Sequence, residues 1–233
     1  MTPFRGKTLG IALGLMLCVA CPGWPAGRTG RGQTIVPAES RMSDQEAAFL
    51  LGKLLSEDSS RETEAVNWLE KTLLLTPENR EARFLLAQTL VRLKRFSAAI
   101  PHLEDLLSKA GNGLPGHGPE IESVRTELAG ALLAAGDAAR ARDLLQAPPE
   151  TALPPSPRRW EILGDSSMSL ADFAGAIAAY RTGLGWCASG TASQNDLSQM
   201  ASRFERKLAL AFLYRGDVRQ AEPALSAFHR KHP

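Results

Sequence analysis

The four histidines are the residues of this chain best suited to metal binding or acid–base chemistry. They are His102, His117, His229 and His232. None of them stands at the spacing from another ligand or from a nucleophile that such chemistry requires. On a helix His102 and Glu104 would point to different faces, and the adjacent carboxylates of Glu104 and Asp105 would diverge in the same way. We therefore expect solvated histidines and no metal site.

Other patterns that could support chemistry are incomplete. The stretch LLGKLLS, residues 50–56, contains a Gly-Lys pair but lacks the earlier glycine of a phosphate-binding loop. The segment HRKH, residues 229–232, is short and basic, and we expect it to be solvated. The sequence holds no Ser/His/Asp or Cys/His arrangement and no cysteine cluster. It therefore predicts a non-enzyme with no catalytic residues and no cofactor.

The composition is that of an ordinary folded protein. Of 233 residues 44% are apolar, and 27 Lys and Arg stand against 25 Asp and Glu. This balance leaves no excess positive charge for a phosphate backbone, so we expect no nucleic-acid partner. Aromatic residues make up only 6%, while Ala and Leu dominate the segments with a regular pattern. Intrinsic propensity therefore favours an all-α fold.

The N-terminal residues have the pattern of a secretory signal. Arg5 and Lys7 precede an apolar run over residues 9–20, and the helix breakers Pro22 and Pro25 follow. Because a helix needs ~20 apolar residues to span a bilayer, this run is too short for a permanent membrane anchor. We expect residues 1–20 to be a signal peptide and the protein to be exported to the periplasm or its membrane surface.

The cleavage site allows two interpretations. The sequence CVAC resembles the lipobox of bacterial lipoproteins, in which Cys21 becomes the acylated first residue, although Cys18 stands where leucine is expected. Ordinary cleavage after Ala20 fits equally, because Cys18 and Ala20 are both small. Only Cys21 and Cys187 remain after cleavage. If Cys21 is acylated, Cys187 is a lone thiol that must be buried; if it is not, a Cys21–Cys187 disulfide would tie a flexible tail to a distant loop, which is the less useful arrangement, so the cysteine count leans towards lipid. A lipid on Cys21 would be the only membrane attachment.

Breaker residues divide the rest of the chain. Residues 21–42 have no periodicity and form an expected tether, and ordered structure is expected over 43–233, from the capping sequence SDQE onward. Loops are predicted at 111–119, 147–157 and 185–196, where Gly, Pro and Ser gather. Between these loops lie paired amphipathic helical patterns. Each helix is apolar on one side only, so each pair must pack against another pair.

One such pair carries a recognisable motif. Trp160, Leu163 and Gly164 are followed by Ala176 and Tyr180 at the spacing W-x2-L-G, then A-x3-Y. This resembles the tetratricopeptide repeat, a helix–turn–helix unit of about 34 residues. Small residues recur in register through five units, in a slot on the first helix and a slot on the second. They are Gly52, after Leu51, with Ala65, Ala87 with Ala99, Ala129 with Ala141, Gly164 with Ala176, and Ala209 with Ala221.

The resemblance implies a fold and a kind of ligand. It implies a right-handed α-solenoid of about five units, in which facing small residues such as Gly164 and Ala176 allow the helices to approach closely. It also implies that a partner protein binds along the first helices of the units. The corresponding positions are Phe49, Lys53, Phe84, Gln88, Thr126, Glu161, Asp165, Arg206 and Leu210. This mixed set lacks the Lys and Asn combination of arrays that clamp a free carboxyl terminus.

The fold and the predicted export together suggest two functions. Exported arrays of this kind resemble lipoproteins that support assembly of a pilus, a secretion channel or an exopolysaccharide export machine. The alternative is an accessory subunit that positions a cell-wall or polysaccharide hydrolase encoded by another chain. We also expect Leu225 and Phe228 to leave part of the last helix uncovered, because no capping helix follows the fifth unit. A partner or a second copy is expected to cover this edge.

Overall fold

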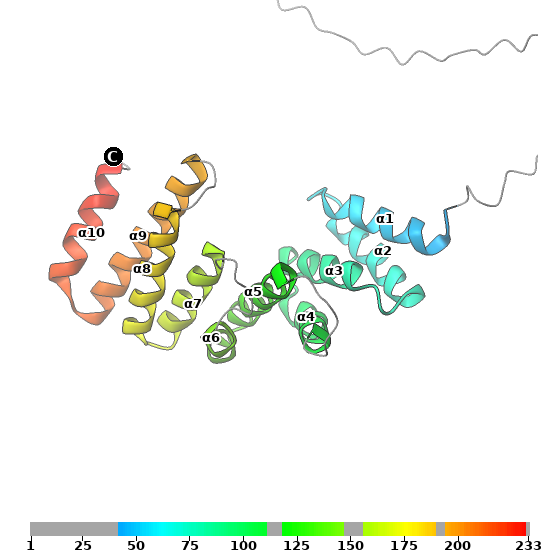
Figure 1. Cartoon of the computed structure of the whole chain (residues 1–233), viewed down its shortest axis with the longest axis horizontal. Helices are drawn as coiled ribbons and strands as arrows, with labels where there is room; N and C mark the ends of the chain where they lie inside the picture. Colours follow the sequence, from blue (N-terminus) through cyan, green and yellow to red (C-terminus); the bar gives the residue numbers. More distant parts are fainter. Residues whose placement is uncertain (1–41, 111–117, 147–155, 190–193, 232–233) are drawn as a thin grey trace, which may run out of the picture. The chain divides into compact units, whose positions relative to one another are not determined.

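The computed structural model of the chain describes residues 42–110, 118–146, 156–189 and 194–231, which form helices and short turns with no strand among them (Figure 1). The described helices are α1 (Asp44–Ser56), α2 (Glu62–Leu75), α3 (Arg80–Arg92), α4 (Phe96–Ala110), α5 (Gly118–Ala134), α6 (Ala138–Gln146), α7 (Pro157–Ser169), α8 (Phe173–Ser189), α9 (Gln194–Arg215) and α10 (Val218–Lys231). The all-α prediction is confirmed. The expected signal peptide, Cys21 and nearly all of the tether lie outside the described residues, as do His117 and the side chain of Phe228.

Local signals set where the helices begin. At the start of α1 the backbone N–H of Ser43 donates to Glu46 Oε2 at 3.0 Å, and the Glu46 N–H donates to Ser43 Oγ at 3.2 Å. This reciprocal capping box is the one that the SDQE sequence predicts. At α3 the side chain of Asn79 accepts a hydrogen bond from the Ala82 N–H at 2.9 Å. Both caps satisfy backbone donors that the helix leaves unpaired.

The helices pack in the order in which they occur. Odd-numbered helices are the first helices of five units and even-numbered helices are the second helices, and each packs against the next along the chain (Figure 1). Each second helix therefore contacts the first helix of its own unit and the first helix of the next unit. Successive first helices also touch one another, from α1 and α3 to α7 and α9. This consecutive packing is that of an α-solenoid.

The small-residue slots lie at the centre of each unit. The second-helix alanines are at most 1% exposed; they are Ala65, Ala99, Ala141, Ala176 and Ala221. Their first-helix partners are buried too; they are Gly52, Ala87, Ala129, Gly164 and Ala209. A larger side chain in such a slot would overpack a close helix contact at a cost of about 1–3 kcal/mol.

The closest neighbour of Gly164 is the large side chain of Tyr180. A Cβ built on Gly164 would lie 2.2 Å from Cε1 of Tyr180, and its three nearest neighbours are all atoms of that ring. The space opposite Gly164 is therefore filled by the aromatic ring one turn further along α8, and glycine is required because the ring lies against its backbone. Trp160 packs at the edge of the same core cluster.

The prediction that Leu51 is a packing residue of the repeat is wrong, because its side chain is exposed. The equivalent residues Leu86, Leu128 and Leu208 are buried and Leu163 is half-buried, since each packs against the preceding unit. No described helix precedes α1, so this contact has no counterpart for Leu51 in the described structure.

Four of the five connections within units, those after α3, α5, α7 and α9, share one backbone feature. Lys94, Gly136, Ala171 and Gly216 occupy the same turn position and have φ values of 59°, 93°, 59° and 84°. Glycine adopts this left-handed conformation without a steric penalty, whereas lysine and alanine do not. After Gly136 the side chain of Asp137 caps α6 by accepting from the Arg140 N–H at 3.1 Å.

The predicted loop at 185–196 is mostly helical. α8 continues to Ser189 and α9 already begins at Gln194. Trp186 packs against the core cluster of α8 and α9, and Cys187 is a buried member of it. These apolar contacts extend the helix past the glycines that predicted a break. Cys187 is thus a buried free thiol.

A buried ionic contact joins the third and fourth units. Arg159, at the start of α7, is 2% exposed and donates to Glu122 Oε2 of α5 at 2.7 Å and to the carbonyl oxygen of Leu145 in α6. Arg125 also pairs with Glu122. Removing one partner of such a buried pair leaves an uncompensated charge and is strongly destabilising. Because Arg159 binds both α5 and α6, it fixes the position of the start of α7 on the preceding unit.

Two glycines of α8 test the close packing. A Cβ on Gly183 would lie 2.4 Å from Cζ of the buried Phe204 ring, whereas a Cβ on Gly185 would have nothing within 4 Å. We expect Gly183→Ala to lower stability by about 1–3 kcal/mol through overpacking. Gly185→Ala should raise it by about 0.5–1 kcal/mol through helix propensity. Urea unfolding followed by circular dichroism measures both, and equal shifts in the two variants would contradict the packing.

Candidate binding groove

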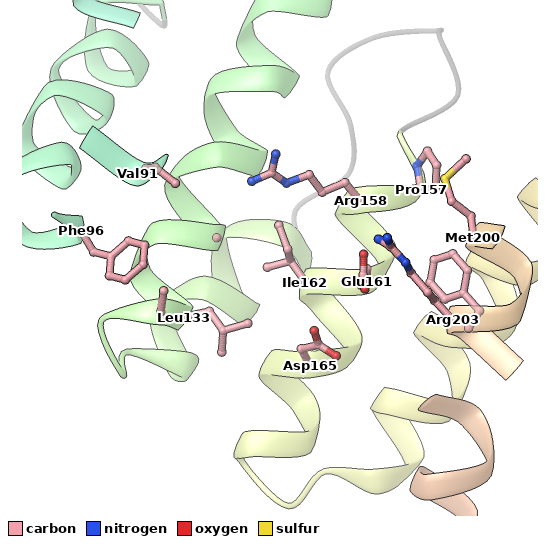
Figure 2. Close-up of a pocket in the computed structure, with 13 residues that line it drawn as sticks. Val91, Phe96, Leu133, Pro157, Arg158, Glu161, Ile162, Asp165, Met200 and Arg203 are labelled. Carbon is pink, nitrogen blue, oxygen red and sulfur yellow. The ribbon is translucent and has the colours of Figure 1, made fainter. Parts of the chain in front are cut away.

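An open pocket of about 750 Å³ lies across α3, the start of α4, α5, α7 and α9, and we call it the groove (Figure 2). Its apolar lining comes from both sides, and includes Val91, Phe96, Leu133, Ile162, Met200 and Phe204. Its charged lining comes from α7 and α9, and consists of Arg158, Glu161, Asp165 and Arg203. Figure 2 shows Val91, Phe96 and Leu133 on one side and the charged side chains on the other. The groove therefore has one apolar side and one mixed side.

Gly130 of α5 gives the groove part of its depth. A Cβ at this residue would meet only Cδ1 of Ile162 at 3.4 Å and Nη2 of Arg158 at 3.8 Å, which are ordinary contacts. Unlike Gly164, this glycine is not required by the packing of the helices. Its lack of a side chain leaves space between Leu133 and Ile162 that a ligand group can enter.

Ion pairs join successive first helices of the array, and those of Arg158 and Lys207 involve residues that line the groove or its neighbour. The N···O distances are 2.8 Å for Lys53–Glu81, 2.8 Å for Arg158–Glu127, 2.7 Å for Lys207–Glu161 and 2.6 Å for Lys207–Asp165. The hydrogen bond from Lys53 to Glu81 raises the pKa of the lysine. Pairs at a surface contribute little stability. Their main effect here is that Lys207 offsets both acids of the groove wall.

Arg203 differs from its counterpart one unit earlier. Arg158 and Arg203 occupy equivalent positions in α7 and α9, and Arg158 pairs with Glu127 of the preceding first helix. The residue equivalent to Glu127 in the next unit is Ile162, which carries no charge. Among the described residues Arg203 forms no ion pair, and its exposed guanidinium lines the groove. The groove thus presents the guanidinium of Arg203 without a carboxylate partner, because Ile162 stands where the preceding unit has Glu127.

A smaller hollow of about 410 Å³ adjoins the groove at Asp165. Tyr180 Oη donates to Asp165 Oδ1 at 2.7 Å, while Asp165 Oδ2 accepts from Lys207 at 2.6 Å. Burial, and then the hydrogen bond to Asp165, raises the pKa of Tyr180 well above its ordinary value. Arg206 and Leu210 line the other side of this hollow.

The structure gathers only part of the predicted partner surface. Glu161, Asp165, Arg206 and Leu210 lie around the groove and the adjoining hollow. Phe49, Lys53, Phe84 and Gln88 lie on α1 and α3 and line neither pocket. Phe84 packs partly into the core.

The prediction that Thr126 belongs to the partner surface is wrong. Thr126 is buried, and its hydroxyl donates to the carbonyl oxygen of Glu122 at 2.7 Å, so a partner cannot reach it.

The sequence analysis missed the apolar residues that line the groove, and it missed Arg203. Gly130 stands at the same unit position as Lys53, Gln88, Asp165 and Leu210, so the repeat register alone would have placed it in the groove. Val91 and Leu133 lie near the ends of α3 and α5, where the pattern indicates only core packing. No sequence signal indicates that Arg203 is unpaired, because this depends on which residue faces it.

His102 and Cys187 are described side chains of types that can support chemistry, and neither lines the groove. No group of three or more side chains that could ligate a metal lies together in the described part of the chain. His102 is half-buried on α4, and burial followed by the charge of Arg83 lowers its pKa. Burial raises the pKa of the Cys187 thiol, which disfavours the reactive thiolate. Within the same residues, no helix has the length and apolar character needed to cross a membrane.

Comparison with known proteins agrees with this architecture. A sequence model of the tetratricopeptide repeat matches residues 57–115. Comparison with the sequences of characterised proteins gives no significant match. Tetratricopeptide-like repeats of a kinesin light chain-like protein from Podosopora anserina are 17% identical with a TM-score of 0.61, covering 79% of this chain and 92% of that one. MamA from Desulfovibrio magneticus is 16% identical with a TM-score of 0.62, covering 82% of this chain and 96% of that one.

These likenesses define the class of protein. At such low identity the solved structures show the fold alone, and that fold is the tetratricopeptide-repeat solenoid. The resemblance to tetratricopeptide repeats is thereby confirmed by the sequence model and by the fold. Proteins with this fold typically act as non-catalytic scaffolds for protein–protein interaction.

The hydrogen bond of Tyr180 predicts a dependence of stability on alkaline pH. The folded state raises the pKa of this phenol above the ~10 of a free tyrosine, so the neutral form is favoured by folding. The stabilisation is fully present below pH ~10 and is lost as the pH rises through the folded pKa. In a Tyr214→Phe variant, tyrosinate absorbance should appear only together with unfolding. Ionisation near pH 10 in the folded protein would contradict the buried bond.

Proposed function

We propose that this chain is an exported, non-enzymatic scaffold that binds a segment of a partner protein in the groove. The observation that carries the proposal is the groove itself, because it is open, largely apolar and formed by rigid helices of successive units. The tetratricopeptide fold supports such a role. Binding sites are commonly concave and apolar with a few polar groups that fix orientation, which describes this arrangement.

The lining indicates what the bound segment carries. Val91, Leu133 and Ile162 offer an apolar surface beside the space above Gly130, which suits a large apolar side chain. Arg203 offers a guanidinium without a structural counterion, which suits a carboxylate. Glu161 and Asp165 already pair with Lys207 and therefore do not call for a basic ligand. We infer a segment in which an acidic residue lies close to a bulky apolar one.

The setting that we propose is the bacterial cell envelope. Support comes from the N-terminal residues, where two basic side chains, a short apolar run and small residues before Cys21 form an export pattern. By analogy of fold and address, the scaffold would support assembly of a pilus, a secretion channel or an exopolysaccharide export machine. We also propose a second contact surface at the edge of the last unit, where Leu225 is exposed.

Photocrosslinking in the producing cells tests the groove. A photoreactive residue in place of Ala134, which is exposed and lines the groove, should give a discrete adduct with the partner. The same residue in place of Ala139, which is exposed on α6 and lines no part of the groove, should not. Adding Gly130→Leu should reduce the Ala134 adduct at least about tenfold, the effect of losing ~1.4 kcal/mol of binding.

A matched variant separates blocking from unfolding. Gly185→Leu introduces the same side chain into another helix at a residue with open space around it, and it should leave the adduct unchanged. Equal adducts from the Ala134 and Ala139 sites, or none from Ala134, would exclude the groove as the binding site.

Mass spectrometry of the purified mature protein tests export. We expect a chain that begins at Cys21, because both interpretations of the signal place cleavage after Ala20. An acyl mass on Cys21 would establish the lipoprotein form, and Cys21→Ser should then release the protein from membranes because the lipid is its only strong anchor. A protein that retains Met1 in the envelope fraction and in the cytoplasm alike would contradict export.

A further inference from the structure

The first helix of the array exposes positions that every later unit buries. The residue two positions after the small slot is Leu54 in α1, and its side chain is 65% exposed. The equivalent residues of the following units are 0% exposed; they are Thr89, Ala131, Ser166 and Ala211. Leu51 is also exposed, whereas its equivalents Leu86, Leu128 and Leu208 are buried and Leu163 is half-buried. We call the surface formed by Leu51 and Leu54 the α1 edge.

The last helix exposes the complementary position. Leu225, four residues after the small slot of α10, is 39% exposed. Its equivalents in the four earlier units are at most 1% exposed; they are Leu69, Leu103, Leu145 and Tyr180. In those units the side chain lies in a core cluster with residues of the next first helix, as Tyr180 does with Phe204. We call the surface around Leu225 the α10 edge.

The two edges correspond to the two surfaces of a helix contact that recurs within the chain. Inside the chain a second helix packs against the first helix of the next unit four times, at α2–α3, α4–α5, α6–α7 and α8–α9. The α10 edge presents the second-helix half and the α1 edge presents the first-helix half. Among the described residues neither half is covered by another helix.

We propose that the α10 edge of one copy packs against the α1 edge of a second copy, so that chains associate head to tail. Because the two surfaces differ, the contact is heterologous and extends into a linear row rather than closing into a two-fold dimer. We infer that the partner is a second copy of this chain. Within the chain a second helix covers the positions equivalent to Leu51 and Leu54, and the α10 edge of another copy is such a second-helix surface. The proposal rests on the second contact surface proposed above at Leu225, and it is independent of the groove and of export.

The size of Leu54 sets the character of this contact. The equivalent positions inside the chain hold Thr, Ala, Ser and Ala, which allow close approach of the helices. A leucine projects further, so copies cannot approach as closely as neighbouring units do. We therefore expect a reversible association that depends on concentration, rather than a permanent oligomer.

Sedimentation equilibrium of the purified protein over a range of concentrations tests this association. We expect the average mass to rise with concentration. The pair Leu51→Lys and Leu54→Lys removes the α1 edge and Leu225→Lys removes the α10 edge, and each variant should stay monomeric. Leu170→Lys changes an equally exposed leucine in the turn after α7 and should associate like the unaltered protein.

Mixing the two edge variants distinguishes head-to-tail contact from any symmetric one. Each variant retains the surface that the other lacks, so an equimolar mixture should form dimers and nothing larger. Circular dichroism of each variant controls for folding, which we expect to be unchanged because the altered side chains are exposed. An unaltered protein that stays monomeric up to about 0.5 mM, where a contact of only ~4 kcal/mol is detectable, overturns the proposal. A mixture of monomers, or association that survives either edge variant, also overturns it.

Discussion

The contact between a small residue on one helix and the side chains of the next is the constraint on which this structure depends. Gly164 shows it most clearly, because the ring of Tyr180 occupies the space that any side chain there would need. Gly52 and Gly183 stand in the same relation to Leu69 and Phe204. Close approach buries the apolar stripe of each helix, which neither helix could bury alone.

Repetition of this contact creates the groove as a by-product. Once each pair is packed, the first helices of successive units lie next to one another and present equivalent positions in a row. These positions face solvent, so packing does not restrict them, and they hold residues as different as Lys53, Gly130 and Asp165. The framework is therefore uniform while the surface is individual, which is how a repeat fold acquires specificity.

Charges act mainly on that surface. The pairs between first helices are partly exposed and contribute little to stability, but they decide which charges remain for a ligand. Lys207 offsets Glu161 and Asp165, whereas for Arg203 the position that holds the pairing acid one unit earlier is occupied by Ile162. The buried pair of Arg159 and Glu122 is different, because it lies inside the array and orients α7. One array thus uses ion pairs both to orient a helix and to leave a cation exposed.

The sequence by itself determined the helical class, the order of the units and the small slots, because these depend on local periodicity and on residue size at fixed spacing. Tertiary structure decided what no local pattern contains. It placed the ring of Tyr180 against Gly164, buried Thr126, exposed Leu51 and left Arg203 unpaired. Each of these outcomes depends on which residue of another helix comes to face the position. Spacing along one helix fixes the direction of a side chain, but only the packing of a neighbouring helix decides what that side chain meets.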